Sequence, residues 1–280
     1  MDSLIAELIL LRKRVATWIL LGFWLFMTIL FGYVLPYYAY KGDIRFRERG
    51  GQVLLTTLLP HNLVTNLLSG FPFFGGTIVL ILGVLAIGSE YSWGTLTPAF
   101  TQRASRLKVF FSKILALAIT LVPFVLLVFL LGFIASVLIA LKEDQPIDLP
   151  SAWLFVRALG ISWFILAAWA TFGVLIAVLS RGTALAIGLG IIYGLVLEGV
   201  ISEFANEISL LSYISKAFLR TNGYSLLSSL GASVTGEGPG SFSGSLVSGT
   251  QAGLVLALEI VVFIAVAATL IKRRDVAGSS

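Results

Sequence analysis

The chain has 280 residues, of which 58% are hydrophobic and only 12% are charged, with a formal net charge of +5. A soluble domain averages about 25% charged residues, so this composition indicates a protein that crosses a membrane several times. The sequence has no cysteine, which excludes disulfides and thiolate metal sites within the chain, and one histidine, His61, leaves little for a histidine-ligated metal. The cations are better explained as orientation signals and lipid headgroup contacts than as a nucleic-acid surface.

Residues 1–14 are expected to form an amphipathic helix at the inner membrane surface. Leu4, Leu8 and Leu11 recur at helical spacing, whereas Glu7 and Arg12 fall on other faces. The charges follow the apolar patch instead of preceding it, and no small-residue cleavage site follows soon. We therefore interpret this segment as retained in the protein and not as a signal peptide.

Six apolar stretches are long enough to cross a hydrocarbon core of about 30 Å. They cover residues 15–36, 66–88, 114–141, 158–179, 184–202 and 251–271. The sequence therefore predicts an all-α membrane protein with a single six-span transmembrane domain over residues 15–280. Glycines and Pro72 predict a kink in the second span, and Pro60 predicts short surface or partly re-entrant helices before it. Residues 203–250 are expected outside, first as short helices and then as a mobile Gly/Ser-rich loop.

The distribution of cations predicts the orientation. Eleven of the 19 Lys and Arg residues lie on the side that holds both termini, and they abut the ends of spans. The positive-inside rule makes this side cytoplasmic, so we expect a multi-pass protein of the cell membrane with both termini inside. The excess of cations on the inner side is small, because four Lys and Arg residues fall in the first outer loop.

Residues 89–113 form a polar and basic passage between two long apolar runs. Such a passage must lie in water beside the membrane or be shielded by protein. Thr97 before Pro98 has the order of an N-cap and first helical residue, which favours short helices there. The cations crowd its second half, at Arg103, Arg106, Lys108 and Lys113.

This passage also carries a family resemblance. It reads Glu90-Tyr91, Trp93-Gly94-Thr95-Leu96, Arg103, Ser105-Arg106 and Lys113. The order and spacing resemble the membrane subunits of ABC type-2 transporters, in the branch of bacitracin export, sodium export and copper-site maturation. In that family the segment is a coupling helix that docks on a separate ATP-hydrolysing subunit.

The resemblance implies an ABC type-2 exporter-like fold in which residues 1–14 are the elbow helix. It implies a permease subunit of an exporter, in a dimer of membrane subunits with two ATP-binding subunits that hold ATP and Mg. The residues that would seat the coupling helix are Glu90, Tyr91, Gly94, Thr95, Arg103 and Arg106. The alternative is a solvated basic loop that anchors two spans, with Lys113 as a headgroup anchor.

Two carboxylates lie inside predicted spans, Glu198 and Glu259. A charge at mid-bilayer costs roughly 2.5 to 3.5 kcal/mol on insertion scales, so each needs a reason to be there. Both are candidates for a translocation path for a cation or proton. For Glu198, about one turn from the end of its span, contact with water or a hydroxyl group is favoured, whereas we expect Glu259 to face the protein interior.

The fifth span has small residues at four-residue intervals, Ala186, Gly190 and Gly194, which let another backbone approach closely. They are consistent with packing inside one subunit or with a dimer contact near the first and fifth spans. No phosphate-binding loop of the form GxxxxGK[ST] is present in the sequence, so we expect no ATP hydrolysis by the chain itself. A structural or regulatory membrane protein, such as an assembly or immunity factor, is the main alternative to a permease.

Overall fold

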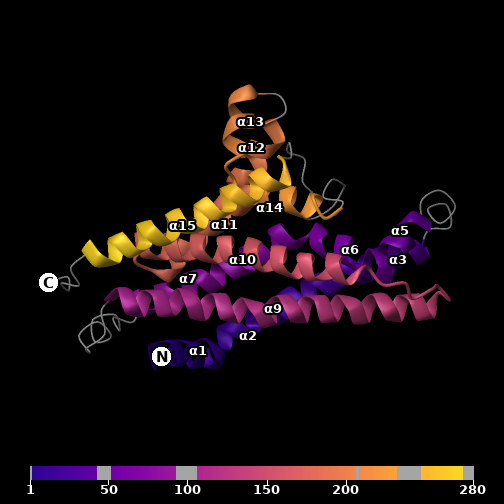
Figure 1. The fold of residues 1–280 in the computed structure, drawn as a ribbon, viewed down its shortest axis with the longest axis horizontal. Coiled ribbons are helices and arrows are strands. Elements are labelled where there is room, and N and C mark those ends of the chain that lie inside the picture. Colours follow the sequence, from indigo (N-terminus) through magenta and orange to yellow (C-terminus); the bar gives the residue numbers. More distant parts are fainter. Residues whose placement is uncertain (1, 43–51, 93–105, 206–207, 232–246, 274–280) are drawn as a thin grey trace.

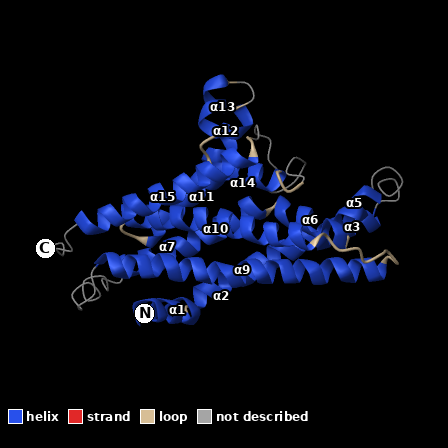
Figure 2. Cartoon of the chain, in the orientation of Figure 1, coloured by secondary structure: helices blue, strands red, loops and turns tan. Residues whose placement is uncertain are grey.

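The computed structural model describes residues 2–42, 52–92, 106–205, 208–231 and 247–273. Within these ranges every regular element is a helix (Figures 1 and 2). Five helical stretches among the described residues are long and apolar enough to cross a membrane, namely Val15–Gly42, Arg106–Lys142, Ala152–Ser180, Thr183–Ser202 and Gly249–Arg273. The chain is therefore a multi-pass membrane protein that is helical throughout its described elements, as its composition predicted.

The chain opens with a short helix followed by a long one. Helix α1 (Asp2–Lys13) ends just before Arg14, whose extended backbone separates it from α2 (Val15–Ile29). The π-helical segment η1 (Leu30–Val34) and α3 (Leu35–Gly42) continue α2 without a break. The first membrane helix therefore extends beyond residue 36, where the apolar run was expected to end.

The second predicted span, residues 66–88, is not one regular helix. The chain passes through α5 (Gln52–Leu58), η3 (Pro60–Asn62), α6 (Leu63–Ser69), the π-helical segment η4 (Phe71–Gly75) and α7 (Gly76–Ser92). The interruption falls among the residues that predicted a kink. Here a Cβ on Gly75 would lie 2.6 Å from the Trp24 ring, and one on Gly76 would lie 2.7 Å from the Trp169 ring. Glycine at both positions allows two buried indoles to approach the backbone of this span.

The next two helices are the longest of the chain, and the second of them packs closely against α7. Helix α9 (Arg106–Lys142) starts at Arg106 and not near residue 114, so the basic residues before its apolar run belong to the helix. Ser151 caps α10 (Ala152–Ser180) by accepting a hydrogen bond from the Leu154 N–H. A Cβ on Gly173 of α10 would lie 2.2 Å from the Leu80 carbonyl oxygen of α7, so these two backbones are in close contact.

The last part of the chain begins with α11 (Thr183–Ile191), η5 (Ile192–Leu197) and α12 (Glu198–Phe204). Helices α12 and α13 (Ser209–Ser215) project from the bundle in Figure 1, while α14 (Leu219–Ser228) returns to it. Helix α15 (Gly249–Arg273) then runs back along α10. Residues 219–227 are buried, because α14 packs against α10, α15 and η4. The sequence predicted short helices here but not that one of them would belong to the core.

Candidate functional site

The polar passage of residues 89–113 is divided between two helices that flank a central part. Glu90 and Tyr91 lie in the last turn of α7, and Arg106 is the first residue of α9. Gly94, Thr95 and Arg103, with the cap at Thr97-Pro98, lie outside the described residues. The described part of the predicted coupling site therefore consists of the two helix ends that flank residues 93–105.

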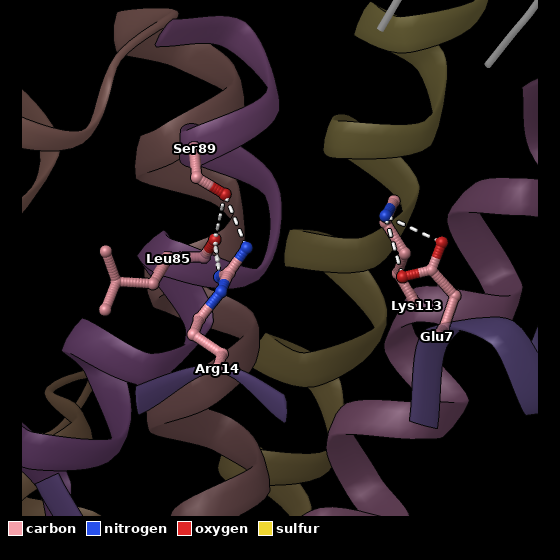
Figure 3. A network of polar contacts seen from close by, with 5 residues as sticks. All are labelled: Glu7, Arg14, Leu85, Ser89 and Lys113. Carbon is pink, nitrogen blue, oxygen red and sulfur yellow. Dashed lines mark hydrogen bonds and ion pairs between the residues drawn. The ribbon is translucent and has the colours of Figure 1, made fainter. Parts of the chain in front are cut away.

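Arg14 joins the N-terminal segment to the end of α7 (Figure 3). Its guanidinium donates hydrogen bonds to the Leu85 carbonyl oxygen and, at 2.7 Å, to the Ser89 hydroxyl oxygen. The Ser89 hydroxyl donates in turn to the Leu85 carbonyl oxygen at 2.8 Å. Arg14 thus donates to a backbone and a side-chain acceptor near the end of α7. From the sequence alone, Arg14 was one of the cations at the start of the first span.

Glu7 joins α1 to the beginning of α9. The Lys113 ammonium lies 2.8 Å from each oxygen of the Glu7 carboxylate (Figure 3). The Lys113 side chain is only 5% exposed and the Glu7 side chain 15% exposed. Lys113 is therefore directed into the protein, and this differs from the headgroup contact considered from sequence. Removal of one partner from a pair this well shielded would leave an uncompensated buried charge, which costs more than the loss of a surface pair.

An apolar contact completes the attachment of α1. Leu11 is 3% exposed and packs with Ala86 of α7 and Ala116 of α9, and Leu4 and Leu8 pack against the same group. Ile5, next to Leu4 in the sequence, is instead 52% exposed. Helix α1 therefore uses one side for contact with protein and presents other apolar side chains outward, as a helix at a membrane surface would.

The turn between α10 and α11 lies at the same end of the bundle. A Cβ on Gly88 would lie 3.0 Å from the Thr183 methyl group and 3.5 Å from the Gly182 carbonyl oxygen. Helix α1, the beginning of α9 and the end of α15 also lie at this end in Figure 1. The described cations here are Arg12, Lys13, Arg14, Arg106, Lys108, Lys113, Arg181, Lys272 and Arg273. We call it the basic end.

A different polar cluster surrounds the two membrane carboxylates. Glu198 does not reach water, because its side chain is fully buried, and its Oε2 accepts a hydrogen bond from the Arg220 backbone N–H at 2.9 Å. The Tyr193 phenol faces the same carboxylate. Glu259 on α15 is partly buried and close enough to Glu198 for the two carboxylates to repel each other. The structure therefore brings both predicted membrane carboxylates into one cluster with an arginine that the sequence reading did not include.

The small residues of the fifth span are in contact with their own chain. Ala186 is fully buried, a Cβ on Gly190 would lie 2.5 Å from the Leu80 side chain, and one on Gly194 would lie 3.0 Å from the Trp169 ring. The small residues at these positions therefore leave room for side chains of α7 and α10 of the same subunit. Among the described residues, no group of three or more His, Cys, Asp or Glu side chains could hold a metal ion.

The chain matches a protein family over most of its length. Residues 25–277 match the family described as "Protein of unknown function (DUF2705)". This match spans most of the chain and contains both polar clusters except for the N-terminal segment with Glu7 and Arg14. No curated protein is detectably similar to the chain.

Proposed function

The chain belongs to the DUF2705 family, and we propose that it is the membrane subunit of an ATP-driven ABC transporter, an exporter coupled to a separate ATP-binding subunit. The observation that carries this proposal is the attachment of α1 to both helices that flank residues 93–105. Arg14 bonds to the end of α7, and Glu7 pairs with Lys113 at the beginning of α9. A segment that receives force from another protein needs flanking helices that are held firmly together, whereas a plain connecting loop does not.

The contacts of α1 with α7 and α9 suggest how a displacement of residues 89–113 would reach the membrane helices. Nucleotide-driven closure of two ATP-binding subunits, which hold the ATP and Mg, would push on residues 89–113. Because α1 is bonded to both flanking helices, α7, α9 and α1 would move together. Helix α7 would pass the displacement to α10 through the close contact at Gly173. This is a shift between two packed arrangements, biased by different contacts in each state.

The proposal includes six spans, with both termini in the cytoplasm. Helix α7 has an apolar part, Gly76–Ser89, that is shorter than the five long helices, so the second crossing would be made by α6, η4 and α7 together. The basic end would face the cytoplasm, in agreement with the positive-inside rule. Two permease copies, identical or related, would form the complex. Since the small residues of α11 and η5 already contact α7 and α10, a second copy would meet outward-facing residues such as Leu185 and Leu189, which are 59% and 48% exposed.

Purification from native membranes tests the proposal. An ATP-binding protein should co-purify with the full chain, and the complex should hydrolyse ATP. Arg106→Glu, at the basic end of α9, should remove this partner or its stimulated ATPase activity while the chain remains in the membrane. Lys142→Glu changes the same charge at the opposite end of the same helix and is the matched control, which should keep both.

Two results would contradict the proposal. One is a chain that purifies in active form with no nucleotide-hydrolysing companion, which would favour the structural or regulatory alternative. The other is an Arg106→Glu variant that retains the partner and normal ATPase stimulation, which would remove residues 89–113 from the contact with that partner.

A further inference from the structure

The cluster around Glu198 and Glu259 has an excess of negative groups inside a membrane segment. We propose that these two carboxylates form a proton-binding site, which holds one proton on Glu259 in the arrangement seen here. The inference depends on the membrane location and on the geometry of the cluster, and it does not depend on the proposed coupling to an ATPase.

The charges of the cluster do not balance when both carboxylates are ionised. Glu198 and Glu259 carry two acidic groups, and Arg220 is the cation that attracts Glu198. Burial raises the pKa of the neighbouring Tyr224 to about 12, so its phenol adds no charge at neutral pH. With both carboxylates ionised the cluster would carry one uncompensated negative charge, and isolated charges are strongly disfavoured in a low-dielectric interior. One bound proton makes the cluster neutral.

Hydrogen bonding distinguishes the two carboxylates. The Oε2 atom of Glu198 accepts the Arg220 N–H, and the Tyr193 phenol faces the same carboxylate, so donors surround Glu198. The Oε2 atom of Glu259 is buried and has no hydrogen-bond partner among the described residues. An ionised Glu259 would leave an acceptor of full charge unsatisfied there. A carboxylic acid is neutral and can donate, which lowers the cost of burying such an oxygen.

The long helices packed against α15 offer no second cation close to the cluster. Helices α10 and α9 pack against α15 together with α14. Helix α10 contains one charged residue, Arg157 in its second turn, and the charged residues of α9 are Arg106, Lys108, Lys113 and Lys142, near its two ends. Neither helix offers a second cation from its central turns. The proton is therefore the simplest positive charge that can complete the cluster.

The site is also placed to respond to movement. Glu198 begins α12, Arg220 lies on α14 and Glu259 lies on α15, so three separate segments define the cluster. Separation of α12 from α15 would remove the repulsion between the carboxylates and admit water. The proton would then leave, and the protonation state would report the arrangement of these helices.

Carbodiimide labelling tests the proposal directly, because dicyclohexylcarbodiimide reacts with protonated carboxyl groups in apolar surroundings. The full chain in lipid nanodiscs should be labelled at Glu259 at neutral pH, as located by peptide mass mapping, and the labelling should fall as the pH rises. Glu259→Gln should lose this label. Glu143 is the internal control, since it follows the end of α9, is paired with Lys41 and should remain unlabelled.

The Glu198→Gln variant distinguishes a proton-binding role of the two carboxylates from a purely structural one. Without the neighbouring negative charge, and with Arg220 still present, Glu259 should ionise more readily. The midpoint of its labelling profile should move to lower pH by about one unit or more, a typical effect of a close charge. An unlabelled Glu259 in the folded wild-type chain, or a midpoint unchanged by Glu198→Gln, would overturn the proposal. Protection of Glu259 by added sodium ions at constant pH would also overturn it, because the site would then bind an alkali cation.

Discussion

Replacement of Glu7 by glutamine should release α1 from the bundle. Lys113 is 5% exposed and holds both carboxylate oxygens at 2.8 Å, so the change removes the anionic partner from a shielded cation. Loss of one member of a buried pair typically costs about 3 to 5 kcal/mol. At the lower value the ratio of docked to undocked α1 should fall roughly a hundredfold, since about 1.4 kcal/mol corresponds to a factor of ten.

Hydrogen exchange of the α1 amides, measured in nanodiscs, would report this change. Exchange should accelerate in Glu7→Gln, while the amides of α10 should be unaffected. The double variant Glu7→Leu with Lys113→Met is the matched control. It replaces both charges with apolar side chains of similar size, a change that is often neutral for buried pairs, and should restore protection. Unchanged exchange in Glu7→Gln, or a double variant no better protected than the single variant, would refute the reasoning.

Two further predictions concern packing and pH. Gly173→Ala places a Cβ 2.2 Å from the Leu80 carbonyl oxygen and should lower the Tm by several degrees, in line with about 1 to 3 kcal/mol for overpacking, whereas Gly160→Ala on the same helix meets nothing within 4 Å and should not. Equal Tm values would contradict the close contact of α7 and α10. Burial acts to raise the pKa of Glu143, but hydrogen bonds from Lys41 and Tyr37 outweigh it and leave that pKa below its usual value. The stabilisation is therefore present above the unfolded pKa of about 4.3 and is lost as the pH falls through the folded value. The protection of the α3 amides, expressed relative to their intrinsic exchange rate at each pH, should fall on acidification in the wild type but not in Glu143→Gln, and identical pH profiles would show that this bond does not hold α3.

The sequence predicted the helices better than their ends. Apolar length is a direct consequence of bilayer thickness, so each of the six apolar stretches coincides with helical structure. The start of α9 was placed near residue 114 because Arg106, Lys108 and Lys113 are polar. A helix that continues beyond the membrane can include such residues, and hydropathy does not register that continuation.

The contacts that assemble the site were beyond the reach of sequence. Glu7 and Lys113 are 106 residues apart, and no local pattern connects them. Arg14 has the position of an ordinary span anchor, and only the fold shows that its guanidinium reaches α7. Arg220 was assigned to an outer helix, so its place beside Glu198 was missed. An arginine next to an interrupted apolar run was the one available signal for a buried partner of a membrane carboxylate.

The small residues of the fifth span show the same limit. Their spacing indicated that another backbone would approach closely, whereas side chains lie nearest to two of these positions. The pattern could not distinguish the same chain from a second copy, because both present apolar surfaces. The structure shows Leu80 and Trp169 at Gly190 and Gly194.

The side of the membrane on which residues 93–105 lie is the most direct test of the account. The sequence has no cysteine, so a single Thr95→Cys change gives one reactive thiol. A membrane-impermeant maleimide should label this thiol in inverted vesicles but not in intact cells, and the ATP-binding partner should protect it. Asp148→Cys, at the opposite end of the bundle, should show the reverse pattern. Labelling of Thr95→Cys from outside intact cells would contradict a cytoplasmic coupling segment and, with it, the proposed function.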